Sequence, residues 1–374
     1  LHMAAVGGHG DVCRALISLG ADINAIDGDG ATALHLAAEA EEGILGINAL
    51  CETGKCKIDI ADSDGRVAMH RAARSGAVGN VIALCEVVGG QLCLQKQDGQ
   101  GNTPMHEAAR IGSLQTIRAM MSKQAQMDIL NREGLDVFGA ALKSGDKALR
   151  VSQFLLQKEI GTLKIRYGEE KRTPLHIAAI GGSEMVMLAL LESVGDRKSK
   201  AQLKLINTTD SNGETAFVLA CKHGNTNAVK ALLDFKCDAQ ADVVVDKEKM
   251  HTCLHIACCI PKKDDPDLVR LLCHAGYDLG KPAGSGQSCI HLAADAGHPG
   301  IVDALVSLGV SPDIKDGYGH SPLHIAASKG RLRVCKALVQ NGARTDVMDN
   351  DGASAIDAAD KNSHKAVGEW LRKQ

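Results

Sequence analysis

A short motif returns along the whole chain at nearly constant spacing, and this repetition limits the possible folds more than any other feature. Its fullest copy, residues 321–330, reads SPLHIAASKG. Ser321 is a favourable N-cap, Pro322 suits the first helical turn, and Gly330 is a typical residue at a helix end. A second segment with apolar residues at helical spacing follows in 331–340. Each copy of the motif therefore predicts a pair of short helices.

The slot of the motif histidine recurs at positions 35, 70, 106, 139, 176, 218, 255, 291, 324 and 357, at intervals of 33 to 42 residues. Gly139, Val218 and Asp357 have replaced the histidine at three of these positions. The histidine is kept at the others, namely His35, His70, His106, His176, His255, His291 and His324.

A period near 33 residues, with a TPLH-x-A core and two short helices, resembles the ankyrin repeat family. The resemblance covers essentially all 374 residues. It implies an all-α solenoid of stacked helix-turn-helix units that are joined by β-hairpin-like loops, here called fingers. It also implies that the motif histidines are structural residues, which bond locally and tie neighbouring repeats together.

We expect one array over residues 1–374, with about eleven repeats. Their approximate bounds are 1–30, 31–65, 66–101, 102–134, 135–171, 172–213, 214–250, 251–286, 287–319, 320–352 and 353–374. The first repeat lacks the polar outer face of a terminal repeat. We therefore expect the chain to be a fragment of a longer protein, truncated on its N-terminal side.

The composition excludes several kinds of partner. Aromatic residues make up 2% of the chain, so the interior must consist of small aliphatic residues and cysteine. The net charge of −3 gives no general case for nucleic-acid binding. No apolar run approaches the roughly 20 residues that a membrane helix needs, so we expect no direct membrane insertion.

The thirteen cysteines are scattered and many occupy core slots of the repeats. This pattern predicts reduced, mostly buried thiols and a cytoplasmic location. Histidines and cysteines crowd into residues 251–291, but stacked repeats keep Cys253 and Cys258 in separate structural positions, so we expect no metal site. No cofactor motif or catalytic motif is recognisable. The sequence predicts a protein that is not an enzyme.

The resemblance implies recognition of a protein partner through a concave face, built from the fingers and the exposed ends of the first helices. Basic residues fall on this face mainly in repeats three to seven, and would suit an acidic or phosphorylated partner. The predicted partner-binding residues are Arg66, Arg74, Arg110, Lys143, Arg172, Lys222 and His223. We expect charge reversal at Arg74 and Arg110 to weaken partner binding and flatten its salt dependence, with the fold intact.

Three alternatives remain open. The charges could form an ordinary solvated face, since Asp64, Glu133, Glu170 and Glu214 lie on the same fingers. A charged insertion, residues 193–207, could contact the partner instead. The predicted function is that of a protein-interaction scaffold or adaptor, and the alternative is a cytosolic regulatory region of a membrane channel or of an enzyme whose active domain lies elsewhere.

One slot carries a more local prediction. Arg71 and Glu107 directly follow the motif histidine in adjacent repeats, where other repeats have an apolar residue. Equivalent positions in stacked repeats lie about 10 Å apart at the backbone. A charge buried alone is costly, so we expect Arg71 and Glu107 to contact each other.

Overall fold

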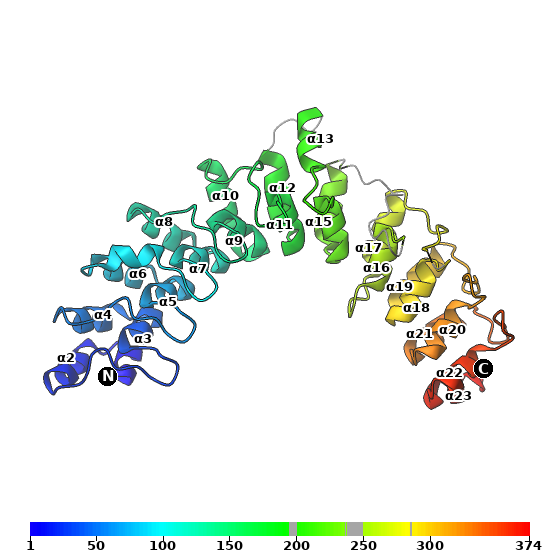
Figure 1. The fold of residues 1–374 in the computed structure, drawn as a ribbon, viewed down its shortest axis with the longest axis horizontal. Coiled ribbons are helices and arrows are strands. Elements are labelled where there is room, and N and C mark those ends of the chain that lie inside the picture. The colour runs from blue at the N-terminus through cyan, green and yellow to red at the C-terminus, as the bar shows by residue number, and fades with distance from the viewer. Residues whose placement is uncertain (194–199, 236, 238–249, 285) are drawn as a thin grey trace. The chain divides into compact units, whose positions relative to one another are not determined.

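The computed structural model describes residues 1–193, 200–235, 237, 250–284 and 286–374. The chain divides into two compact units, Leu1–Gly195 and Asp196–Gln374. Both are built from paired helices, which confirms the all-α, repeat-based fold class (Figure 1). None of the helices in the described ranges has the length and apolar character needed to span a bilayer.

In the first unit, the motif helices pack side by side in chain order and the following helices form a second layer against them (Figure 1). The motif helices are α1 (His2–Val6), α3 (Ala33–Glu39), α5 (Ala68–Ser75), α7 (Pro104–Ile111), α9 (Val137–Lys143) and α11 (Pro174–Gly181). The second helices are α2 (Gly10–Ser18), α4 (Ile44–Cys51), α6 (Val78–Glu86), α8 (Leu114–Ser122), α10 (Leu149–Gln157) and α12 (Glu184–Ser193). Two 3₁₀ turns, η1 (Gly90–Gln95) and η2 (Gly145–Ala148), interrupt the pattern.

The second unit is built in the same way, and opens with α13 (Lys200–Ile206). Its motif helices are α14 (Ala216–Lys222), α16 (Cys253–Cys259), α18 (Cys289–Ala296), α20 (Pro322–Ser328) and α22 (Ala355–Lys361). Its second helices are α15 (Thr226–Asp234), α17 (Pro266–His274), α19 (Pro299–Ser307), α21 (Leu332–Gln340) and α23 (Lys365–Leu371). Residues 194–199 of the predicted charged insertion lie outside the described residues.

The motif helices begin where the sequence places a cap. In α7, Nδ1 of His106 accepts a hydrogen bond from the backbone N–H of Thr103 (3.1 Å) and lies 2.8 Å from the Thr103 hydroxyl. Nε2 of the same ring donates to the carbonyl of Leu135 in the next repeat, at 3.0 Å. Burial lowers the pKa of His106, which keeps the ring neutral and able to serve both partners. One residue thus caps its own helix and ties it to the next finger.

The same bonds to the following finger are made by the other motif histidines for which a ring Nε2 contact is resolved. These are His35 to Arg66, His70 to Asn102, His255 to Lys281, His291 to His320 and His324 to Ala353, each to a backbone carbonyl at 2.9 to 3.1 Å. His176 caps α11 through Thr173.

The core consists mainly of alanine, leucine, isoleucine, valine and cysteine, as the low aromatic content predicts. The alanine pair that follows six of the seven motif histidines is buried, for example Ala72 and Ala73 at 0% exposure, and this lets the thin helices approach closely. Nine of the thirteen cysteines are buried too, so most thiols serve as small core residues. Their reduced state remains a prediction.

The fingers are short antiparallel turns closed by an aspartate. We assign each finger to the motif helix that follows it, so the finger at residues 62–66 belongs to α5 and the third repeat. In this finger, Oδ1 of Asp62 accepts from the backbone N–H groups of Asp64 and Arg66 at 3.0 and 2.9 Å. Asp98, Asp210, Asp316 and Asp349 repeat this pattern in other fingers. Isolated antiparallel bridges, such as Ile26 to Thr32, mark the finger bases. Each finger is therefore held rigidly beside its own motif helix.

Candidate partner-binding groove

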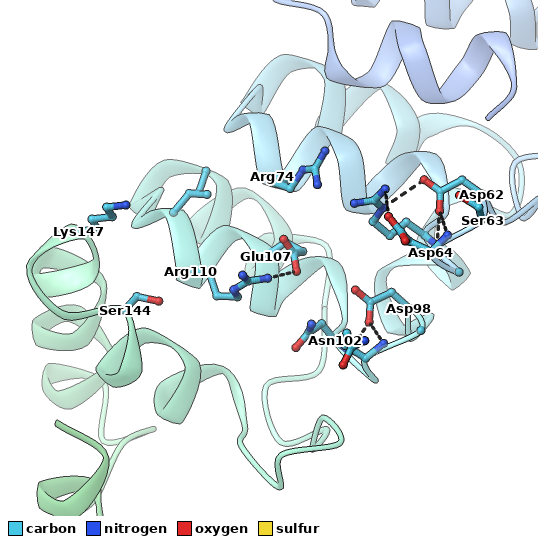
Figure 2. Close-up of a pocket in the computed structure, with 15 residues that line it drawn as sticks. Asp62, Ser63, Asp64, Arg74, Asp98, Asn102, Glu107, Arg110, Ser144 and Lys147 are labelled. Atoms are coloured by element: carbon cyan, nitrogen blue, oxygen red, sulfur yellow. Dashed lines mark hydrogen bonds and ion pairs between the residues drawn. The ribbon is translucent and has the colours of Figure 1, made fainter. Parts of the chain in front are cut away.

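A hollow of about 1020 Å³ lies between the fingers and the exposed ends of the motif helices in repeats three to five (Figure 2). We call it the groove. Its charged lining residues are Asp62, Asp64, Asp98 and Glu107 on the acidic side, with Arg66, Arg74, Arg110 and Lys147 on the basic side. Four charges of each sign make the lining neutral in sum, although it is strongly polar.

The groove continues along the repeats. A hollow of about 320 Å³ shares Arg110 and Ser144 with it and adds Glu133 and Lys143. A further hollow of about 900 Å³ shares Lys143 with that one and adds Arg172. Five of the predicted partner-binding residues therefore line one continuous series of hollows. Lys222 and His223 belong to the second unit, where Lys222 pairs with Glu214.

Each predicted basic residue in these hollows has a carboxylate partner. Arg66 pairs with Asp62 and Asp64, Arg74 with Glu39 at 3.3 Å, and Arg110 with Glu107 at 2.8 Å. Lys143 pairs with Glu133 at 2.5 Å, and Arg172 lies 3.9 Å from Glu170. The predicted cations therefore lie beside carboxylates, as in the alternative of a mixed, solvated face.

The expected contact between Arg71 and Glu107 is wrong. Arg71 donates through Nε and Nη2 to Oδ2 of Asp62 at 3.1 and 2.8 Å, and its Nη1 reaches Glu39 at 3.3 Å. The Asp62 carboxylate is held beside Arg71 by the finger that precedes α5. The guanidinium therefore binds Asp62 and not a side chain of the neighbouring helix. Burial alone would raise the pKa of Asp62, but hydrogen bonds from Arg71 and Arg66 outweigh it and the pKa is lowered.

Glu107 finds a different partner because its own finger offers a like charge. Asp98 has, in the finger before α7, the place that Asp62 has in the finger before α5. The Asp98 carboxylate would repel that of Glu107. Oε1 of Glu107 instead accepts from Nη1 of Arg110, one helical turn later. The Glu107 side chain is 5% exposed and that of Arg110 55%, so the pair joins the buried wall of the groove to its open side.

The sequence-based reasoning missed Lys147, which lines the far side of the groove from Asp64 and Asp98 (Figure 2). It lies in η2, where the fifth repeat departs from the regular connection between helices. Gly112 ends α7 with φ of +77°, and a Cβ there would lie 1.8 Å from the Lys147 carbonyl oxygen. Glycine therefore lets η2 approach the groove, and this unusual turn is the only sequence signal for the residue.

Nothing in the described part of the chain forms a metal-binding set of three or more His, Cys, Asp or Glu residues. In the crowded region of repeats eight and nine, both ring nitrogens of His255 are engaged, Nδ1 with Thr252 and Nε2 with the Lys281 carbonyl.

Comparison with known proteins decides the family. The profile of the family described as ankyrin repeats (3 copies) matches residues 1–93, 105–202, 199–283, 254–351 and 290–374. The chain belongs to the ankyrin repeat family. Ankyrin arrays generally serve as protein-interaction modules and are generally not catalytic.

Two relatives show the range of proteins that contain similar arrays. "Ankyrin repeat domain-containing protein 63" of Mus musculus is 28% identical over 178 residues, 48% of this chain and 43% of that protein. "Transient receptor potential cation channel subfamily A member 1" of Homo sapiens is 27% identical over 247 residues, 65% of this chain and 21% of that protein. The ankyrin array thus spans less than half the length of the curated relatives that it matches.

Proposed function

We propose that the groove of repeats three to five binds a protein partner through an acidic or phosphorylated segment, without catalysis. The supporting observation is the row of exposed cations Arg74, Arg110 and Lys143 on the motif helices, continued by Lys147. Their side chains are about half exposed, and Lys147 has no ion pair among the described residues.

The existing ion pairs do not prevent this role. Exposed pairs contribute about 0–1 kcal/mol each, because solvent screens them and two long side chains must be ordered. A carboxylate or phosphate of a partner can therefore replace Glu39 at Arg74, or Glu133 at Lys143, at little cost. A phosphate would gain more than a carboxylate, since it has up to two negative charges and three acceptor oxygens.

The test is a binding screen with the purified chain against an array of degenerate peptides, with and without one central phosphoserine. We expect enrichment of Asp, Glu or phosphoserine, and loss of binding in Arg74→Glu with Lys147→Glu. Arg110 is kept because reversing it would place a second carboxylate beside the buried Glu107. The matched control, Lys336→Glu with Lys361→Glu, makes the same charge change on α21 and α22. Equal loss in both double variants would contradict the proposal.

A second candidate is a regulatory region of a membrane channel. It is favoured by the alignment of 65% of the chain with a channel relative. Partner binding in the groove is compatible with this role, since a regulatory array also acts through contacts. We also propose a reducing compartment such as the cytoplasm, supported by the burial of most cysteines in core positions.

A further inference from the structure

The groove has two charged sides of opposite sign, and they belong to different structural elements. The helix side presents Arg74, Arg110 and Lys143 from α5, α7 and α9. The finger side presents Asp64, Asp98 and Glu133 from the fingers of the same three repeats. Each repeat therefore contributes one cation from its helix and one carboxylate from its finger. We call these the helix row and the finger row.

The two rows lie within reach of one bound segment. Lys143 of the helix row meets Glu133 of the finger row at 2.5 Å, so the side chains span the width of the groove at the fifth repeat. Figure 2 shows Asp64 and Asp98 at one side of the pocket, Lys147 at the other, and Arg110 between them. The Asp64 and Glu133 side chains are 65% and 56% exposed, so they are open to a ligand.

Neither a uniformly acidic nor a uniformly basic segment satisfies both rows. A run of acidic residues would pair with the helix row, but would bring its remaining charges against Asp64, Asp98 and Glu133. A run of basic residues would meet the opposite repulsion from the helix row. Like charges in close contact lower affinity and are a common source of specificity.

We infer that the partner segment is an extended peptide in which acidic and basic residues alternate. Successive side chains of an extended strand point to opposite sides. A strand lying along the groove therefore directs every second residue to the helix row and the residues between to the finger row. With acids facing the helices and bases facing the fingers, the Lys143–Glu133 pair that opens on binding is replaced by two pairs with the peptide. This inference rests on the proposed function, because it specifies the segment bound in the same groove.

The length of the segment follows from the repeat spacing. Three repeats with packed helices about 10 Å apart extend over roughly 20 Å between the first and third. A strand rises about 3.3 Å per residue, so six to eight residues cover this distance. A ten-residue peptide is long enough to reach all three repeats with one residue to spare at each end.

The experiment compares three ten-residue peptides by fluorescence anisotropy at low ionic strength, where exposed charges are least screened. The first alternates Glu and Lys, the second has five Glu followed by five Lys, and the third alternates Glu and Gln. The first two have the same composition and net charge, so only the pattern differs. Exposed pairs of about 0.2–1 kcal/mol, summed over three repeats, predict roughly tenfold tighter binding of the alternating peptide than of the block peptide.

A charge swap within one repeat sharpens the test. Lys143→Glu with Glu133→Lys preserves the ion pair and the net charge, but exchanges the two rows at the fifth repeat. We expect the affinity of the alternating peptide to fall roughly threefold and its advantage over the block peptide to shrink. The matched control exchanges an exposed pair of the second unit, Arg344→Asp with Asp346→Arg, and should leave binding unchanged.

The outcomes separate this inference from the proposed function. If the block peptide binds as tightly as the alternating one, or the Glu-Gln peptide binds more tightly, the alternating pattern is wrong although an acidic partner stands. If none of the three peptides binds and phosphoserine peptides also fail, the proposed function falls with it. An unchanged preference in the swapped variant would likewise overturn the inference.

Discussion

The slot directly after the motif histidine is occupied differently in two parts of the molecule. Repeats nine and ten have Leu292 and Ile325 there, each 8% exposed, as expected for a seam between stacked helices. Repeats three and four have Arg71 at 8% and Glu107 at 3%. The same backbone position is thus equally buried in both regions, but only the region beside the groove fills it with charge.

The difference shows that burial in an array does not dictate the chemistry of a slot. Arg71 and Glu107 are tolerated because each has a partner close at hand, Asp62 for the first and Arg110 for the second. A buried ion pair seldom stabilises a protein more than well-packed apolar residues would. Stability therefore gives no reason to prefer these charges over leucine. Glu107 lines the groove and Arg71 holds Asp62, which also lines it, so the proposed binding role supplies one: the two charges fix Arg110 and Asp62 in place.

Removing the carboxylate of Asp62 should have the largest effect. Asp62→Ala leaves the buried guanidinium of Arg71 without its main partner, and we expect a loss of about 3–5 kcal/mol in the free energy of unfolding, measured by urea denaturation. The matched variant Asp316→Ala removes the equivalent finger carboxylate beside the apolar Ile325. It should cost only about 1–2 kcal/mol, from lost hydrogen bonds. Equal losses would contradict the contrast between the two regions.

A smaller loss is expected when Glu107 is unpaired. Arg110→Ala leaves the buried carboxylate without the exposed arginine that satisfies it, and should lower the free energy of unfolding by about 1–3 kcal/mol. Adding Glu107→Leu should restore most of this, since the ninth repeat has leucine at the same slot. Lys329→Ala, which breaks the exposed pair with Asp295, is the control and should change stability by less than about 0.5 kcal/mol. A double variant no more stable than Arg110→Ala would show that Glu107 has another role.

The smallest effect is the coupling between Arg71 and Glu107 themselves. Each has its own partner, so a double-mutant cycle with Arg71→Leu and Glu107→Leu should give an interaction energy below about 0.5 kcal/mol. Urea denaturation of the two single variants and the double variant measures it. A coupling well above 1 kcal/mol would mean that the two side chains act on each other after all.

The repeat pattern predicted the parts of the fold that depend on local chemistry. The cap formed by Thr103 and His106 can be recognised from the motif alone, because helix capping needs only neighbouring residues. The partner of Arg71 could not be assigned in the same way, since a finger carboxylate and a charge on the next helix both lie within reach of a long side chain. The sequence does place an aspartate eight residues before the motif histidine in several repeats. This regularity was the signal that could have indicated Asp62 as the partner of Arg71.

The cations of the groove and some of its carboxylates were identified from the sequence, but the ion pairs between them were not. The cations were found by their place in the repeats, whereas their pairing with Glu39, Glu107 and Glu133 depends on side-chain geometry. Lys147 was not identified because η2 replaces the regular connection between the helices of the fifth repeat. The other repeats give no indication of which side chains this turn exposes. The surroundings of a residue at a regular repeat position can be inferred from equivalent residues in other repeats. Those of a residue in an irregular segment can be learned only from the structure.

Hydrogen–deuterium exchange of the full chain, with and without the alternating Glu-Lys peptide, shows directly where the peptide binds. We expect slower exchange in the fingers around 62–66 and 98–102 and in 143–147 when the peptide is bound. The corresponding finger of the tenth repeat, residues 316–320, should not change. Protection confined to the second unit, or none at peptide concentrations that saturate binding, would contradict the claim that the groove of repeats three to five is the binding surface.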